Sequence, residues 1–346
     1  MKNTMKRLAL LISLILCCLS ASYPRTSLRV LQFNIWQEGT MVKGGFDAIV
    51  ENIIALNPDV VTFSEVRNYQ GVQFIDKLLK ALAARGAEYH GRNSVSTGII
   101  AKEEIISQEV VYPLKNDRGS VLKTVVDIGN HEMAFYSAHL DWLNCSSYLP
   151  RGYDGCTWKE LPSPVTDAKT VGDDNRASMR DDEIRALMAD ADKERNHGRM
   201  VFIGGDFNEP SLLDWTEKTK NLRDHNGLVI DWDCSRLLLD FGFKDAFREM
   251  YPDPVKIPGF TFPANNPDAA LKKLCWAPHA DDRERIDYIY YLPDGHLRLK
   301  SVKVVGPKGF ILYGKRTAEA KDKKLIRPKG VWPTDHKALL AIFEIK

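Results

Sequence analysis

Apolar residues recur along this chain at two spacings, which predict both helices and strands. Phe46–Leu56, Phe74–Ala84 and Arg180–Arg195 have the spacing of amphipathic helices, and the first ends at Asn57–Pro58 because proline cannot continue a helix. Alternating or continuous apolar runs predict strands at Leu28–Asn34, Asp59–Glu65, Gly98–Ala101, Val121–Ile128, Ala134–Asp141, Val201–Ile203, Arg285–Tyr291, Leu299–Val305 and Ala338–Ile345. No short repeat and no linker rich in proline or serine divides the chain, so we predict one domain.

The predicted strand at Val201–Ile203 stops at a pair of glycines, and polar side chains follow at once. The stretch from 200 to 210 reads MVFIGGDFNEP, with Asp206 and Asn208 just after the glycines. Glycine lets the backbone turn tightly and approach a ligand, so these side chains would project beyond the edge of the sheet. Taken alone, the stretch is equally compatible with a polar turn, and we interpret Glu209 as a turn residue.

Other predicted strands also carry polar side chains at or near their ends. Each one has an ordinary structural explanation, such as a buried histidine or a charge that closes a strand. A series of them along one chain is what a polar site at one rim of a sheet produces. The series comprises Asn34, Glu65, His139, Asp141, Asp287, Asp335 and His336.

Residues 1–22 differ from the rest of the chain and predict a secretory signal peptide. A basic start precedes the apolar run Leu8–Leu19, which small residues follow and which is too short to predict a membrane span. We therefore expect an exported protein, periplasmic, secreted or at the cell surface, whose domain covers residues 23–346. Lipid attachment at Cys17 or Cys18 is disfavoured because the residue before them is bulky, and membrane contact is expected only with such an anchor.

The charge balance is close to neutral. The 346 residues have a formal net charge of +2, and the predicted signal peptide removes three cations and no acids, which leaves −1. Proteins that bind nucleic acid without specificity usually carry a positive field, so this balance counts mildly against a tight binder of polyanions. It does not exclude an enzyme that releases its product. At 44% apolar residues, the chain can form a substantial core.

Four cysteines lie beyond the predicted signal peptide. An even number of cysteines in an exported chain predicts two disulfides, and zinc is disfavoured because no CxxC spacing occurs. The nearest pairing joins Cys145 to Cys156 and Cys234 to Cys275.

The polar series combines carboxylates, carboxamides and imidazoles. Hard oxygen ligands suit Mg²⁺, Mn²⁺ or Ca²⁺, whereas zinc would require more histidine or cysteine. A divalent cation beside a histidine paired with a carboxylate suits phosphoryl hydrolysis, because the metal offsets the phosphate charge while a base activates water. The sequence contains neither GxSxG nor the phosphate-binding GxxxxGK[ST].

The ordered motifs resemble the endonuclease/exonuclease/phosphatase superfamily, the relatives of DNase I and exonuclease III, and we expect an exported, bacterial-type member. The motifs are QFN, FSEV, SAHLD, GGDFN, RIDYIY and TDH, and they extend from about residue 28 to the C-terminus. The resemblance implies an α/β fold, a four-layer α/β/β/α sandwich of two facing mixed sheets flanked by helices. It also implies a metal-dependent phosphoesterase site at one rim that uses Mg²⁺ or Mn²⁺.

The resemblance also implies a role for each matching residue. Glu65 would be the main metal ligand, with Asn34 beside it and Asp335 near the metal. Asp206 would orient or deprotonate water, and Asn208 would hold a phosphate oxygen. His336, oriented by Asp287, and His139 would serve the phosphate or the leaving group. Many members have an acid at the position of Trp36, so one ligand is missing here.

A long segment at about 142–179 separates the HLD motif from the next predicted helix. We predict that it overhangs the site and selects the substrate, with a decorative surface loop as the alternative. Its candidate substrate contacts, and two weaker candidates outside it, are Tyr148, Arg151, Tyr153, Trp158, Arg118 and Asp141.

We expect a hydrolase of a small or lipid-type phosphodiester or phosphomonoester, with no stable protein partner. The first alternative is a nuclease that acts on DNA or RNA. The second is a catalytically inactive binding protein on the same fold, which is disfavoured because the polar series is complete.

Overall fold

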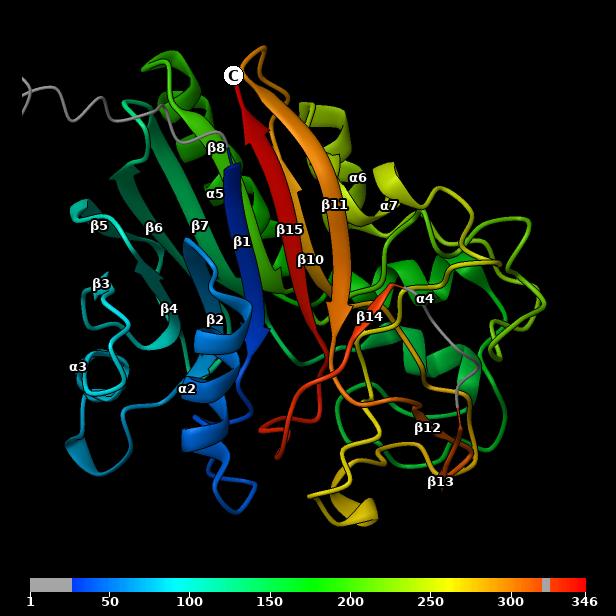
Figure 1. Ribbon diagram of the computed structural model, residues 1–346. Coiled ribbons are helices and arrows are strands. Elements are labelled where there is room, and N and C mark those ends of the chain that lie inside the picture. The colour runs from blue at the N-terminus through cyan, green and yellow to red at the C-terminus, as the bar shows by residue number, and fades with distance from the viewer. Residues whose placement is uncertain (1–26, 319–323) are drawn as a thin grey trace, which may run out of the picture.

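The computed structural model describes residues 27–318 and 324–346 and shows two facing β-sheets with helices on their outer faces (Figure 1). This is the predicted sandwich of two mixed sheets flanked by helices. The predicted signal peptide and the candidate lipid-attachment cysteines lie outside the described residues. Within the described ranges, no helix has the length and apolar character needed to cross a membrane.

The first sheet has seven strands in the order β14-β11-β15-β1-β2-β4-β3. Its centre is the parallel pair β1 and β2, which places Asn34 opposite Ser64, and β15 runs antiparallel to β1. The strands are β1 (Ser27–Asn34), β2 (Val60–Val66), β3 (His90–Gly91), β4 (Ser96–Ala101), β11 (Leu297–Val305), β14 (Leu325–Ile326) and β15 (Ala338–Ile345).

The second sheet has six strands in the order β5-β6-β7-β8-β10-β9. Only β7 and β8 run parallel in it. The strands are β5 (Ile105–Tyr112), β6 (Ser120–Asp127), β7 (Glu132–His139), β8 (Met200–Asp206), β9 (Lys244–Asp245) and β10 (Asp287–Tyr291). A separate two-stranded sheet pairs β12 (Ile311–Leu312) with β13 (Lys315–Arg316).

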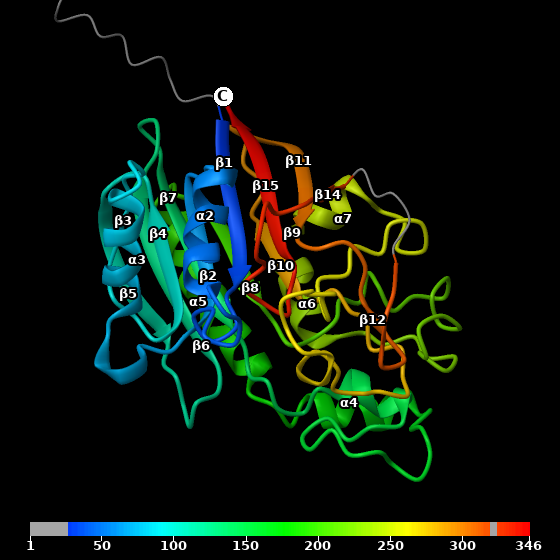
Figure 2. The ribbon, with the colours of Figure 1, turned by 60° about the horizontal axis from the view of Figure 1, so that its bottom comes forward.

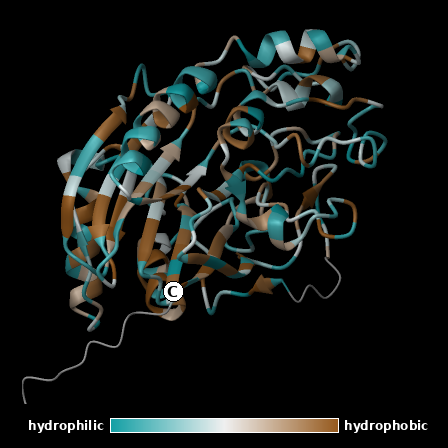
Figure 3. Cartoon of the chain, turned by 90° about the horizontal axis from the view of Figure 1, so that it is seen from above, coloured by the Kyte–Doolittle hydropathy of each residue, from teal (hydrophilic) through white to brown (hydrophobic). Residues whose placement is uncertain are grey.

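The main core lies between the two sheets. Phe202 of β8 stacks on Phe135 of β7 and packs edge-on against Phe343 of β15, so aromatic rings join the sheets. Seen from above, the strands carry long hydrophobic stretches, whereas the outer helices alternate in hydropathy (Figure 3). Each helix therefore buries one stripe and exposes the other.

The glycine pair Gly204–Gly205 lies inside β8 and does not end it, which corrects the expected strand end. A Cβ on Gly204 would lie 2.2 Å from the hydroxyl of Thr62 in the facing sheet. A Cβ on Gly205 would lie 2.5 Å from the carbonyl oxygen of Ala138. The glycines therefore allow a close approach of β8 to its neighbours, and the strand continues to Asp206.

Helices cover the outer face of each sheet (Figure 2). Helix α2 ends where Asn57 adopts a left-handed conformation before Pro58, as the sequence predicted. The first sheet is covered by α2 (Gly45–Leu56) and α3 (Phe74–Ala83), and the second by α5 (Arg180–Asn196) and α6 (Asp233–Phe241). The short helix α7 (Ala246–Met250) contacts β10 and β11, and single 3₁₀ turns occur at η1 (Tyr69–Gly71) and η3 (Leu271–Lys273).

The long segment between β7 and α5 contains two regular elements that the sequence did not predict. They are the 3₁₀ segment η2 (Ser146–Arg151) and helix α4 (Ala168–Asn175). Asp167 caps α4 by accepting a hydrogen bond from the Thr170 amide at 2.8 Å. Helix α4 lies beyond the ends of the strands in Figure 2.

The two predicted disulfides are wrong, because all four described cysteines are free thiols. Cys234 is buried in the cluster beneath α5 and α6, whereas Cys275 packs with a different cluster around Trp36. Cys145 and Cys156 lie near each other in the segment at 142–179, but the Cys145 thiol donates to the Trp142 carbonyl at 3.1 Å. Backbone and side-chain hydrogen bonds hold this segment in place of a covalent link.

Candidate active site

Strand register brings three of the predicted site residues into one row. Asp206 ends β8, and its neighbours across the sheet are His139 at the end of β7 and Asp287 at the start of β10. All three side chains are buried. Residues that are distant in sequence therefore meet at one rim of the second sheet, as the sequence predicted.

The first sheet contributes Asn34 and Glu65 to the same rim. The amide nitrogen of Asn34 donates to Glu65 Oε1 at 3.1 Å and to Asp206 Oδ2 at 2.8 Å, so one side chain joins the two sheets. Its oxygen accepts from the Trp36 amide at 2.9 Å. Asn34 thus presents N–H groups to both carboxylates, an arrangement that positions them.

Glu65 has an unusual backbone conformation. Its φ of 72° lies in the left-handed region, at an irregularity where β2 pairs with β4. This conformation re-aims the side chain, whose Oε2 accepts a hydrogen bond from the Gln37 amide at 2.9 Å. A strained non-glycine residue next to buried carboxylates is typical of a functional position.

His336 contacts two carboxylates through its two ring nitrogens. Nδ1 lies 2.9 Å from Asp287 Oδ2, and Nε2 lies 3.8 Å from Asp206 Oδ2. The side-chain Nε2 of Gln32 donates a hydrogen bond to Asp287 Oδ1 at 2.9 Å and so holds this carboxylate in place. Burial alone would lower the pKa of His336, but the charges of Asp287 and Asp206 outweigh it and raise that pKa well above its usual value. The imidazole is therefore positively charged at neutral pH.

Burial raises the pKa of Asp206 to about 7, and it does the same for Asp335. In both cases the charge of His336 opposes the effect of burial. Carboxylates that are costly to ionise in isolation are stabilised in the charged form by a nearby cation.

Asp206, Asp287 and His336 have ligand atoms within 4.8 Å of one another, but the ring of His336 is already held by Asp287. Glu65 and Asp335 line the same cavity, and their carboxylate oxygens are ligands of the kind that a hard divalent cation prefers.

His139 differs from His336 in its charge state. Burial lowers the pKa of His139 to about 4, so the ring is neutral at pH 7. Its Nδ1 lies 2.9 Å from the hydroxyl of Ser96. A neutral imidazole can exchange hydrogen bonds with a substrate without adding positive charge.

Asn208 lies just beyond Asp206 and is held close to it. Its backbone has a φ of 50°, and its amide donates to Asp206 Oδ1 at 3.0 Å. The side-chain nitrogen donates to the Leu140 carbonyl at 3.0 Å, which leaves its second N–H for a ligand. The loop after β8 therefore holds both side chains of the GGDFN motif at the site.

Most of these residues line one cavity of about 490 Å³, whereas Asn34 and Asp287 lie behind its lining and hold the residues that face it. Its base contains Glu65, His139, Asp206, Asn208, Asp335 and His336. The segment at 142–179 covers one side, because Trp142, Cys145, Ser147, Tyr148 and Trp158 also line it. Of the predicted substrate contacts, the structure therefore brings Tyr148 and Trp158 to the cavity.

The structure does not bring the other four candidates to the cavity. Arg118 and Asp141 form an ion pair with each other, and Asp141 also accepts from the Met179 amide at 3.0 Å. Arg151 is buried in an ion pair with Glu284, 2.6 Å from its Oε1. Tyr153 is buried and donates to Glu160 Oε1 at 2.9 Å. These residues hold the segment at 142–179 and its surroundings in place.

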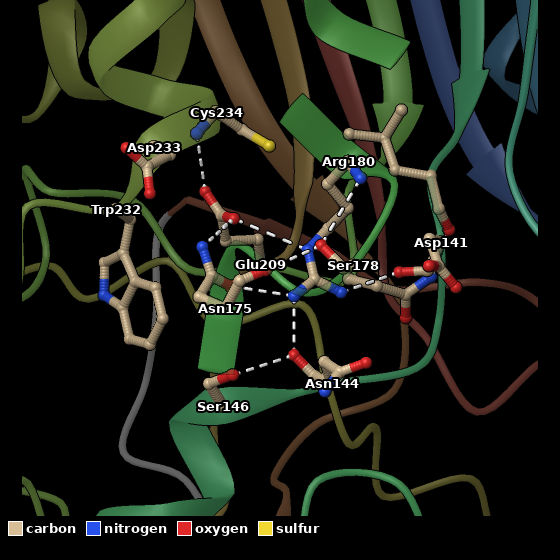
Figure 4. Close-up of polar contacts among 12 residues, drawn as sticks. Asp141, Asn144, Ser146, Asn175, Ser178, Arg180, Glu209, Trp232, Asp233 and Cys234 are labelled. Carbon is tan, nitrogen blue, oxygen red and sulfur yellow. Dashed lines mark hydrogen bonds and ion pairs between the residues drawn. The ribbon is translucent and has the colours of Figure 1, made fainter. Parts of the chain in front are cut away.

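Glu209 is not the turn residue that the sequence suggested. It is 1% exposed, and it accepts from the Cys234 amide at 2.8 Å and from the Asn175 side chain at 2.7 Å (Figure 4). The fully buried Arg180 lies 3.4 Å from Glu209 and donates to the carbonyl of Asn144. This network ties α4 and α5 to the loop that carries Asn208.

Sequence reasoning missed several residues that line the cavity. They lie in loops with no motif signal, and only the tertiary fold brings them there. They are Gln37, Arg67, Asp117, Trp142, Trp276 and Asp282. Trp36, which the sequence indicated only as the position of a missing acid, lines the cavity as well.

Comparisons with known proteins agree with this fold. A model of the Endonuclease/Exonuclease/phosphatase family matches residues 31–336. An uncharacterised protein of Caenorhabditis elegans is 28% identical over 341 residues, which are 96% of this chain and 97% of that protein.

Solved structures are similar in fold at low sequence identity. D. rerio TDP2, complexed with a single-strand DNA product, has a TM-score of 0.52 and 13% identity and covers 92% of this chain and 98% of its own. The human Nocturnin catalytic domain, with a bound sulfate anion, has a TM-score of 0.51 and 15% identity and covers 92% of this chain and 95% of its own.

Proposed function

This chain belongs to the endonuclease/exonuclease/phosphatase family, and on that premise we propose that it hydrolyses a phosphate ester with the help of a divalent cation, Mg²⁺ or Mn²⁺. One observation carries the proposal. The buried pair of His336 and Asp287 faces the Asp206 carboxylate at the base of a cavity that is large enough for a small substrate.

Glu65 and Asp335 would hold the cation, with Asp206 beside them. The cation would offset the charge of the phosphate and of the departing oxygen. Asn34 would keep Glu65 and Asp206 in place through its two N–H groups. This ligand set has no acid from position 36, where Trp36 stands.

The remaining groups have complementary tasks. Asp206 would accept a proton from the attacking water, since burial raises the pKa of this carboxyl to about 7 and makes it a suitable base at neutral pH. His336, kept charged by Asp287, would donate a hydrogen bond from Nε2 to a phosphate oxygen. Asn208 would donate to another phosphate oxygen, and the neutral His139 would serve the phosphate or the leaving group.

A small or lipid-type phosphate ester is the substrate that we favour. Among the described residues that line the cavity, Arg67 is the single arginine or lysine, and it is paired with Asp117. A nucleic acid would be expected to need more cations along its path. The nuclease alternative is supported by the D. rerio TDP2 structure, which holds a DNA product. An inactive binding protein is disfavoured because Glu65, Asp206, Asn208, Asp287 and His336 are all present, whereas an inactive relative usually lacks at least one such group.

Export and the boundary at residue 23 remain proposals that rest on the amino-acid pattern of residues 1–22. The single domain over 23–346, with an insertion at about 142–179, is also a proposal, and it rests on the absence of a short repeat or a linker in the sequence. The similarity of the Caenorhabditis elegans protein over nearly its full length gives no reason to restrict this chain to a bacterial type.

A substrate panel tests the proposed function. Bis-p-nitrophenyl phosphate, inositol phosphates, sphingomyelin, plasmid DNA and RNA would each be incubated with Mg²⁺, Mn²⁺ or EDTA. We expect hydrolysis of a small ester that EDTA abolishes and that Asp206→Asn lowers on the order of a hundredfold. Asp240→Asn is the matched control, since this exposed carboxylate on α6 lies outside the cavity. Activity that EDTA leaves unchanged would refute the metal mechanism.

A further inference from the structure

We propose that Asp282, Tyr148 and a row of three tryptophans form a subsite for the alcohol part of the phosphate ester, and that this part carries a hydrogen-bond donor and no negative charge. An ammonium or a hydroxyl group has this chemistry. The inference rests on the proposed phosphoesterase function and extends it to the group attached to the phosphate.

Asp282 is a buried carboxylate that lacks a full set of partners. It is 2% exposed and lines the same cavity as the catalytic groups, and its Oδ2 makes no hydrogen bond within the described structure. An unpaired buried carboxylate oxygen is costly unless a ligand supplies a donor. Burial raises the pKa of Asp282 to about 7, although Arg151 opposes the effect, so a cationic ligand would stabilise the charged form.

Tyr148 and the tryptophan row form the apolar part of the subsite. Trp158 stacks on Trp142 with ring centroids 6.0 Å apart, and it contacts Trp276 at 4.9 Å. All three rings line the cavity, together with Tyr148. Aromatic rings attract cations through their faces and also pack against the CH groups of a polar alcohol.

The walls of the subsite come from two segments that are distant in the sequence. Tyr148 and Tyr153 pack with Ala277 and Ala280 in one buried cluster, against which Trp158 also packs. The segment at 142–179 is thereby joined to the segment that carries Trp276 and Asp282. The subsite is therefore part of the folded structure rather than a mobile surface loop.

The charges of the described cavity residues exclude an anionic alcohol group. Three carboxylates line the cavity away from the catalytic groups at its floor: Asp117, Asp282 and Glu284. Arg67 is engaged by Asp117, and the buried Arg151 is engaged by Glu284. A second negative charge on the substrate would meet no free cation there, whereas a donor or a positive charge would meet Asp282.

Four p-nitrophenyl phosphodiesters of matched size test the inference. They carry the group X–CH₂–CH₂–O on phosphorus, where X is ammonium, hydroxyl, methyl or carboxylate, and kcat/KM is measured with Mg²⁺. We expect the order ammonium, hydroxyl, methyl, carboxylate. The ammonium ester should exceed the methyl ester roughly ten- to a hundredfold, the range of a hydrogen bond to a charged group.

The variant Asp282→Asn should abolish the preference for the ammonium ester over the methyl ester. The exposed carboxylate Asp240 again supplies the matched control, Asp240→Asn, which should keep the wild-type order. A methyl ester that is cleaved as fast as the ammonium and hydroxyl esters would overturn the inference. So would a folded Asp282→Asn variant that keeps the preference. The wild-type order needs no variant, so the inference can fail even if Asp282→Asn does not fold.

Binding separates this inference from the proposed function. Tryptophan fluorescence of the wild type, titrated with phosphoethanolamine and with propyl phosphate, reports on the ring stack without turnover. Tighter binding of phosphoethanolamine with no hydrolysis of any ester would refute the proposed function and support the subsite. Equal binding together with equal hydrolysis of the esters would support the proposed function and refute the subsite.

Discussion

Nδ1 of His336 lies 2.9 Å from Oδ2 of Asp287, although 48 residues separate the two positions in the chain. The contact directs the other ring nitrogen toward Asp206, 3.8 Å away. One carboxylate thus orients and charges an imidazole that faces a second carboxylate. This relationship explains why the TDH motif at the end of the chain belongs to the site.

Asp287→Asn should weaken catalysis and change its pH dependence. Asp287 is the neighbour that most strongly opposes the effect of burial on the pKa of His336, so its loss lowers that pKa. Because activity requires the charged imidazole, its loss at alkaline pH should then begin at a lower pH than in the wild type. We expect kcat to fall on the order of a hundredfold. A pH profile of kcat between 5 and 10 measures both effects, and an unshifted alkaline limb would contradict the assigned role.

Glu65→Gln should raise the metal requirement. The substitution keeps the size of the side chain and an oxygen for the Gln37 amide, but it removes the charge that would bind a cation. We expect the Mg²⁺ concentration for half-maximal activity to rise at least about tenfold. Measuring activity against Mg²⁺ concentration tests this, and an unchanged midpoint would remove Glu65 from the metal site. Glu51→Gln, on the exposed face of α2, provides the control.

Glu209→Ala should destabilise the protein strongly. The substitution leaves the buried Arg180 without its carboxylate and removes the acceptor of the Cys234 amide. Breaking a buried ion pair from one side costs about 3–5 kcal/mol. Urea denaturation measures the loss. Glu217→Ala breaks the exposed pair with Lys220 and should cost less than about 1 kcal/mol. Equal losses would show that the network of Figure 4 does not stabilise the fold.

Glu183 should make the protein less stable as pH rises. Burial raises the pKa of this carboxyl to about 8, against 4.5 for the ordinary group. Between these values the folded protein holds a proton that the unfolded chain has released, so the free energy of unfolding falls with increasing pH. The variant Glu183→Gln should lack this decrease in the free energy of unfolding, which is on the order of 2–4 kcal/mol.

Urea denaturation at pH 5 and pH 8 tests the Glu183 prediction by comparing the pH-dependent loss in the two proteins. His139 acts in the opposite direction, because its lowered pKa makes stability rise up to about pH 6.5. The comparison of wild type with Glu183→Gln cancels that contribution. An identical pH dependence in both proteins would contradict the raised pKa.

Short-range patterns were sufficient to predict most of the framework. The strands that carry Asn34, Glu65, His139, Asp206 and Asp287 were all predicted, because apolar periodicity and strand ends are local properties. The end of α2 at Asn57–Pro58 also follows from local stereochemistry. The glycine pair was misinterpreted, since the need for Gly204 arises from Thr62 on the facing sheet.

The sequence by itself determined which side chains could form a phosphoesterase site, since it fixes their chemical type and their order along the chain. The tertiary structure decided what each one contacts. It showed that Asn34 holds two carboxylates, that Glu209 is buried against Arg180, that the four described cysteines are free, and that Asp282 lines the cavity. The physical reason is that hydrogen bonding, desolvation and pKa depend on atoms that the fold brings together from distant segments, and no local pattern encodes those contacts.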